Sequence, residues 1–105
     1  MNRRLVYVTI VGAGHYGKDL VAPKYKNNKF CKIKAVISPH VKREVLSKSA
    51  LATVPLYRTV DEWYGNTGSV LPTHVFDLCV HYDALRDLVV KLVKIGARNF
   101  VFPKP

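Results

Sequence analysis

The stretch LVYVTIVGAGHYG, from Leu5 to Gly17, decides the fold of this chain. Its first half, Leu5 to Val11, is rich in β-branched residues, which is typical of a strand buried in a sheet. Its second half, from Gly12 to Gly17, matches the pattern G-x-G-x-x-G. The pattern is weak by itself, but here it follows a strand and opens a helix expected from about His15. In that setting it predicts a turn that binds the phosphates of a dinucleotide.

Each residue of this glycine turn has a separate expected task. Gly12 allows the tight turn, Gly14 lets the backbone approach a pyrophosphate, and Gly17 permits close packing of the helix on the strand. The backbone N–H groups of His15 and Tyr16 would face the phosphates at the helix N-terminus, with the Tyr16 ring against the cofactor. The alternative is a tight strand-to-helix turn that binds no ligand.

Strands and helices alternate along the rest of the chain. Further strands are expected at 33–38, 54–57, 75–80 and 99–102, with helices from about residue 15, over 41–51, from residue 60 to the glycines at 65 and 68, and up to Gly96. Pro23 should kink or end the first helix. Thr59 and Glu62 match a capping box at the start of the third. Such alternation predicts an α/β fold, a Rossmann-like doubly wound parallel sheet in the order 3-2-1-4-5 with helices on both faces.

The end of the second strand bears on the choice between NAD and NADP. NAD-binding domains usually carry an acid about 20 residues beyond the glycines, for the ribose hydroxyl. Here the strand ends at Ser38, and Lys42 and Arg43 follow, while Glu44 lies too far into the next helix. Ser38 can donate a hydrogen bond and the two cations can pair with a 2′-phosphate, so NADP is favoured and NAD is the second choice. The alternative is that Lys42 and Arg43 are a solvated helix face.

Composition and charge limit the other functions. The chain has 105 residues, enough for one domain, and a net charge of +10 that favours a polyanionic partner. Basic residues interleave with Tyr25 and Phe30 over 24–34, but no recognition motif accompanies them, so nucleic-acid binding is not expected. No apolar run is long enough to span a membrane, and no His/Cys cluster has metal-ligand spacing. Cys31 and Cys79 form no disulfide framework, and Cys79 is expected to be a buried thiol. A cytoplasmic location fits this cysteine usage.

With these residues placed, the chain resembles the cofactor-binding half of the Gfo/Idh/MocA oxidoreductase family. The resemblance covers essentially the whole chain and rests on VTIVGAGHYGKDLVAP (8–23), VPLYRTVDEW (54–63), FDLCVHYDALRDLVVKLVKIGARNFVF (76–102) and the final PKP (103–105). That last motif is similar to the family's Glu-Lys-Pro. The resemblance implies that Lys104 lies near the nicotinamide and assists proton transfer. The alternative for Lys104 is a basic terminus without a role.

The chain also departs from the family pattern. Pro103 replaces the motif's glutamate, and Val80 and His81 stand where the family usually has Thr-Pro. Val80 would contact the cofactor, and His81 would face the crevice as an acid or base, or else cap the next helix or lie exposed. The family's second domain, which supplies the substrate pocket, is absent from residues 1–105.

We therefore expect a dinucleotide-binding domain over residues 1–105. Completed by a substrate domain in cis or in trans, it would serve an oxidoreductase that transfers hydride to or from a carbonyl or alcohol carbon. The alternative is a nucleotide-binding or assembly module without catalysis. A domain lacking its covering half exposes apolar surface, so a homo-oligomer is also expected.

Overall fold

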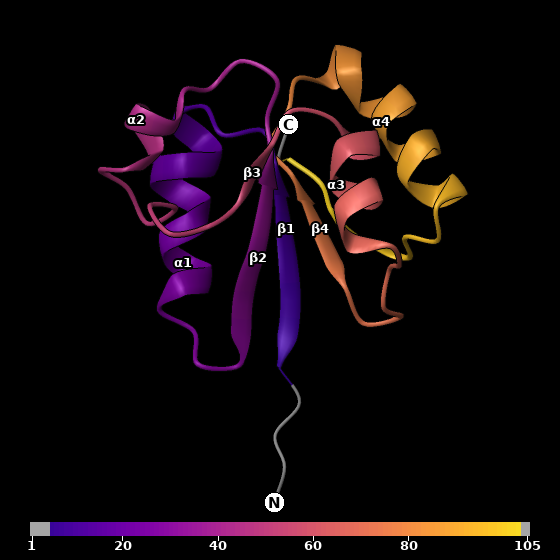
Figure 1. Cartoon of the computed structure of the whole chain (residues 1–105), viewed down its shortest axis with the longest axis horizontal. Helices are drawn as coiled ribbons and strands as arrows, with labels where there is room; N and C mark the ends of the chain where they lie inside the picture. The colour runs from indigo at the N-terminus through magenta and orange to yellow at the C-terminus, as the bar shows by residue number, and fades with distance from the viewer. Residues whose placement is uncertain (1–4, 104–105) are drawn as a thin grey trace, which may run out of the picture.

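The protein forms one five-stranded parallel sheet with helices on both faces (Figure 1). The computed structural model describes residues 5–103. The strand order is β3-β2-β1-β4-β5, so the predicted fold is confirmed. The strands are β1 (Val6–Val11), β2 (Cys31–Ile37), β3 (Leu56–Tyr57), β4 (Val75–Leu78) and β5 (Asn99–Val101).

Strand β1 lies at the centre because it pairs with both β2 and β4. Val8 and Ile10 are buried on one face of the strand, and Thr9 and Val11 are buried on the other, so the sheet is covered on both faces at β1. The chain leaves β1 toward β2 on one side and returns through β4 on the other, so the strand order reverses between β1 and β4. Open α/β sheets bind ligands at such a switch point, outside the carboxyl ends of the strands.

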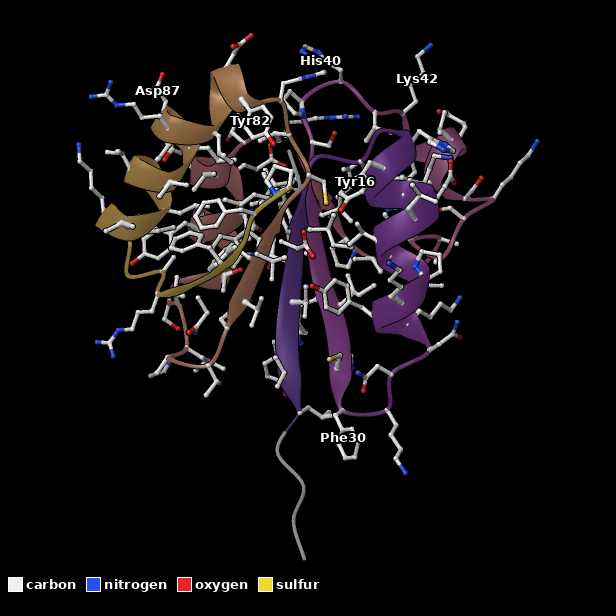
Figure 2. The ribbon with its side chains drawn as sticks, turned by 180° about the vertical axis from the view of Figure 1, so that it is seen from behind. Tyr16, Phe30, His40, Lys42, Tyr82 and Asp87 are labelled. Atoms are coloured by element: carbon white, nitrogen blue, oxygen red, sulfur yellow. The ribbon has the colours of Figure 1, made fainter. Side chains whose placement is uncertain are left out.

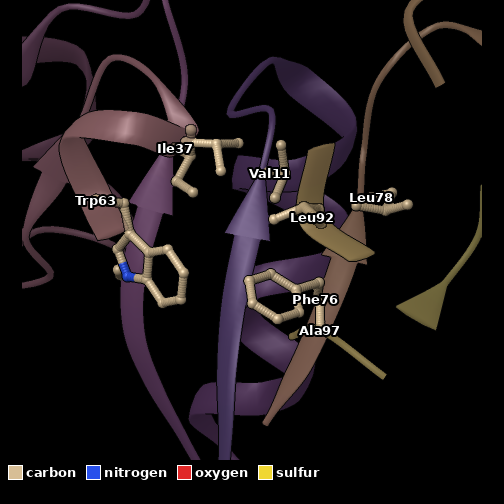
Figure 3. Close-up of a cluster of buried hydrophobic side chains, with 9 residues drawn as sticks. Val11, Ile37, Trp63, Phe76, Leu78, Leu92 and Ala97 are labelled. Carbon is tan, nitrogen blue, oxygen red and sulfur yellow. The ribbon is translucent and has the colours of Figure 1, made fainter. Parts of the chain in front are cut away.

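Two hydrophobic cores flank the sheet. One joins the β1 residues Val8 and Ile10 to Ala22 and Leu46. The other joins Val11, Phe76 and Leu78 to side chains of the opposite helices, and Figure 3 shows this cluster. The helices are α1 (Ala22–Lys26), α2 (Arg43–Leu46), α3 (Val60–Thr67) and α4 (Tyr82–Lys94).

The first helix continues past Pro23. A π-helical turn, η1 (Tyr16–Val21), precedes α1, and the Ala22 N–H donates to the Gly17 carbonyl. Pro23 then falls in the first turn of α1, where a missing N–H is tolerated. The expected irregularity is therefore present as a widened turn. Of the two expected outcomes, a kink or an end near Pro23, the structure shows a local irregularity before Pro23, and the helix then ends at Lys26.

The ends of α2 and α3 agree only in part with the ends predicted from the sequence. The Thr59 hydroxyl accepts from the Glu62 N–H at 3.1 Å, as a capping residue should, and Gly68 ends α3 with a positive φ of 80°. Gly65 lies inside α3 and does not end it. The helix expected over 41–51 shrinks to the four residues of α2, because turns take over from Ser47.

Among residues 5–103, no helix has the length and apolar character needed to cross a membrane.

Candidate functional site

The glycine turn is packed against the end of β4. A Cβ on Gly12 would lie 2.3 Å from the Cys79 carbonyl oxygen, and φ at Gly12 is +95°, so only glycine fits. The Cys79 N–H donates to the Val11 carbonyl at 2.7 Å, which holds β4 against the turn. Val80 adds its side chain to the same contact, with Cγ1 3.0 Å from the position of that Cβ.

Gly17 joins the helix to the same turn. A Cβ there would lie 2.2 Å from the Gly12 carbonyl oxygen and 3.1 Å from Cys79 Cβ. The helix therefore approaches the strand end more closely than a side chain at position 17 would allow. This is the close packing that the sequence predicts for the third glycine.

Gly14 differs from both, since a Cβ there would meet nothing within 4 Å. The space beside its backbone is open, as a backbone that approaches a pyrophosphate requires. The first turn of a helix presents N–H groups that have no partner within the helix, and a partial positive charge. The turn and the following helix can therefore hold an anion over Gly14, so the residues present fit a dinucleotide phosphate.

The side chains of this first turn form an exposed cluster. His15 Nδ1 lies 2.8 Å from a carboxylate oxygen of Asp19, and the Lys18 ammonium donates to its other oxygen at 2.7 Å. That hydrogen bond from Lys18 is the main reason why the pKa of Asp19 lies below its usual value. Tyr16 is exposed, and Figure 2 shows it near the carboxyl ends of the strands. Lys18 thus balances the negative charge of Asp19 within this turn.

The β2 end carries basic groups. Ser38 is buried, and its hydroxyl accepts weakly from the Ala13 N–H at 3.4 Å. Lys42 is exposed at the start of α2, and Figure 2 shows Lys42 and His40 at the same edge of the molecule. Arg58 was missed by the sequence reasoning. It donates to the Ser38 carbonyl at 3.2 Å and to the Val41 carbonyl, so it brings a further cation to this edge. Its place directly after β3, the neighbour of β2, was the signal that could have found it.

The Arg43 side chain is held by hydrogen bonds within the protein. Its guanidinium donates to the carbonyls of Val54, Leu51 and Ala52 at 2.6, 2.8 and 2.7 Å. These bonds tie α2 to the loop that precedes β3. The side chain is therefore engaged within the protein, which argues against the predicted contact with a 2′-phosphate.

Of the two residues predicted to act in catalysis, the structure describes only His81. His81 is exposed just before α4, and its side chain makes no hydrogen bond that caps the helix. It thus stands at the switch point, next to Val80. Lys104 lies outside the described residues, so its role stays a prediction.

A buried polar group lies between α1 and β4. The Tyr25 hydroxyl donates to Asp77 at 2.5 Å, and the Cys79 thiol donates to the other oxygen at 3.4 Å. Burial, followed by the influence of Asp77, raises the pKa of both Tyr25 and Cys79. Cys79 therefore stays a protonated thiol. The group fixes α1 against the strand that carries the switch point.

Comparison with known proteins supports the fold. No protein-family model matches the chain, and no curated protein matches it. Among solved structures, it is similar to the crystal structure of a probable oxidoreductase, yhhX, with a TM-score of 0.75 and 17% sequence identity. The match covers 96% of this chain and 28% of that one, so the chain spans less than a third of that protein's length. The two chains share this doubly wound, Rossmann-like fold.

Proposed function

We propose that this chain binds a nicotinamide dinucleotide at the switch point between β1 and β4, as the cofactor-binding domain of an oxidoreductase. The observation that carries the proposal is the contrast among the three glycines. Gly12 and Gly17 have no room for a Cβ, while Gly14 opens onto free space at a helix start. A strand-to-helix turn without a ligand needs glycine at positions 12 and 17, but not at position 14. The similarity to a probable oxidoreductase agrees with this proposal.

We further propose that NADP is preferred over NAD. No acid follows the end of β2 until Glu44, and Lys42 and Arg58 lie nearby. A carboxylate there would repel a 2′-phosphate, whereas exposed cations attract it. Lys42, with Arg58 in place of Arg43, is therefore the proposed source of that charge.

The redox step is proposed on the Gfo/Idh/MocA resemblance. The bound nicotinamide would supply or accept the hydride, and residues of a substrate domain in cis or in trans would bind the carbonyl or alcohol substrate. His81 follows β4 at the switch point, where it would hold or donate a proton beside a reacting oxygen. Lys104 is proposed for the same task, as the family motif implies.

Paired titrations of the purified chain test this function. NADPH and NADH are titrated by calorimetry at one fixed salt concentration, with cofactor fluorescence as a second readout. We expect NADPH to bind at least about tenfold more tightly than NADH, which corresponds to ~1.4 kcal/mol. Equal binding would refute the NADP preference, and binding of neither would refute the dinucleotide site.

Matched variants then locate the preference. Lys42→Gln and Arg58→Gln should each lower the affinity for NADPH and leave that for NADH unchanged. Lys24→Gln removes an exposed lysine from α1 and is the control, because it changes the net charge equally. If the control loses as much affinity as the other two, the preference reflects overall charge and not the β2 edge.

A further inference from the structure

A second cavity lies on the sheet face opposite α1. It has a volume of about 380 Å³, within the range of small-molecule sites. Residues of β1, β2, β3 and α3 line it, together with His74 just before β4. None of the glycine-turn residues takes part. The cavity is thus separate from the proposed dinucleotide site.

Aromatic side chains form much of its wall. Tyr7 and Tyr57 line it from the sheet, and Trp63 lines it from α3. Trp63 is 2% exposed, so it belongs to the core behind the wall, and its indole meets the rings of His74 and Phe76 edge-on, with ring centroids 5.5 and 5.4 Å apart. Figure 3 shows Trp63 in the buried cluster that contains Phe76 and Leu78. Such walls favour a flat apolar or aromatic ligand.

One cation reaches this cavity because of an irregularity in β2. Val8 pairs with Ile33 but Thr9 pairs with Ala35, so Lys34 is an extra residue in the strand. A bulge of this kind re-aims a side chain. The Lys34 ammonium lies 5.1 Å from the centroid of the Tyr7 ring. Of the described residues that line the cavity, none is Asp or Glu, so the charge of Lys34 has no acidic counterpart there.

His74 does not add a second charge at neutral pH. Burial, with a smaller contribution from Lys34, lowers the pKa of His74 to about 4. The ring is hydrogen-bonded through Nε2 to the Thr9 hydroxyl at 2.7 Å and stacks on Phe76. It is therefore a neutral, fixed part of the wall. The hydroxyl-bearing residues Thr67 and Ser69 lie at the rim as further polar groups.

We propose that this cavity binds a small aromatic carboxylate, whose ring lies against Tyr7 and Tyr57 above the buried Trp63 and whose carboxylate pairs with Lys34. A flat ring meets the aromatic wall, and a single negative charge balances the single cation. A larger polyanion would also pair with Lys34, but only a small ligand can enter a cavity of about 380 Å³. The observations therefore favour the small carboxylate over a nucleic acid.

The single tryptophan of the chain makes the test direct. Benzoate is the probe, and it is titrated against the full chain while Trp63 emission and calorimetric heat are recorded. Benzamide keeps the ring without the charge, and acetate keeps the charge without the ring. We expect benzoate to saturate both signals and to bind at least about tenfold more tightly than either control compound.

Two variants and a matched control test whether Lys34 supplies the charge that binds benzoate. Lys34→Gln should weaken benzoate binding about tenfold, and Lys34→Arg should retain most of it. Lys32→Gln is the control, because Lys32 is exposed on the same strand but does not line the cavity. Thermal melting of each variant shows that the fold is kept. Should Lys34→Gln fail to fold, Lys34→Arg and the benzamide comparison still decide the matter.

Three results would overturn the proposal. The first is an absence of saturation by benzoate in the low-millimolar range. The second is equal binding of benzamide, which would show that Lys34 does not contribute. The third is tight, salt-sensitive binding of a single-stranded oligonucleotide that falls equally with Lys32→Gln and Lys34→Gln and that benzoate does not displace. That outcome would make this face a nucleic-acid surface.

Discussion

Replacing Gly17 by alanine should destabilise the domain through one contact. The new Cβ would lie 2.2 Å from the Gly12 carbonyl oxygen, whereas ordinary contact begins at 3.4 Å. The obstacle is backbone, which cannot rotate away, so the helix must shift from the strand end by roughly 1 Å, and overpacking of this kind costs about 1–3 kcal/mol. Alanine in a helix returns at most about 1 kcal/mol. We therefore expect Gly17→Ala to lower the free energy of unfolding by about 2 kcal/mol.

Thermal melting and urea denaturation measure this loss against two matched glycines. Gly14→Ala and Gly65→Ala also add a Cβ, but nothing lies within 4 Å of either position. Both should therefore keep wild-type stability or gain a few tenths of a kcal/mol. For a domain of this size, Gly17→Ala should lower Tm by about 10 °C. If Gly17→Ala melts with the wild type, the close approach of helix and strand is wrong. If Gly14→Ala stays folded yet still binds NADPH at full affinity, the proposed role of the open backbone at Gly14 is wrong.

The remaining predictions concern polar groups inside the fold. The pKa of His74 is lowered to about 4 from 6.5, so the unfolded chain binds more protons between these values and stability should fall by up to ~3 kcal/mol as the pH drops from about 6.5 to 4. Urea titrations at several pH values measure this fall, and His74→Gln should flatten it; an equally steep fall in that variant would assign the effect to other groups. Arg43→Ala should cost about 2 kcal/mol in urea denaturation, since it removes the donors to three carbonyls, and it should leave the ratio of NADPH to NADH affinity unchanged. A lost preference with intact stability would restore Arg43 to the cofactor site. Tyr25→Phe should cost about 1–3 kcal/mol because it leaves the buried Asp77 without its main donor, and wild-type stability in this variant would show that Asp77 finds another partner.

The course of the first helix shows how a tertiary contact overrides a local signal. The sequence places Pro23 inside a helical stretch, which by itself indicates a kink or an end. Tyr25 lies beyond Pro23, however, and it packs against the core beside β1 and donates its hydroxyl to Asp77, so helix continuation keeps contacts that an early end would lose. The π-helical turn before Pro23 lets the helix continue without an ordinary turn at that point.

The sequence by itself determined the architecture and the glycine turn. Both depend on local patterns, namely apolar strands alternating with helices and glycines at positions where a Cβ has no room or no neighbour. The Thr59 cap and the glycine at the end of α4, with φ of +106° at Gly96, belong to the same class, because their geometry involves residues close in the chain.

Only the tertiary structure decided which side chains remain available. Arg43 and Arg58 are both arginines near the β2 end, and no local pattern separates them. Arg43 is half-buried and donates to carbonyls of the loop before β3, while Arg58 holds the loop after β2 but remains exposed beside the proposed site. Likewise, Lys34 looks like one more basic residue until the bulge in β2 turns it toward Tyr7. The physical reason is that hydrogen bonds and charge pairs join residues far apart in the chain, and their partners are set only when the sheet has assembled.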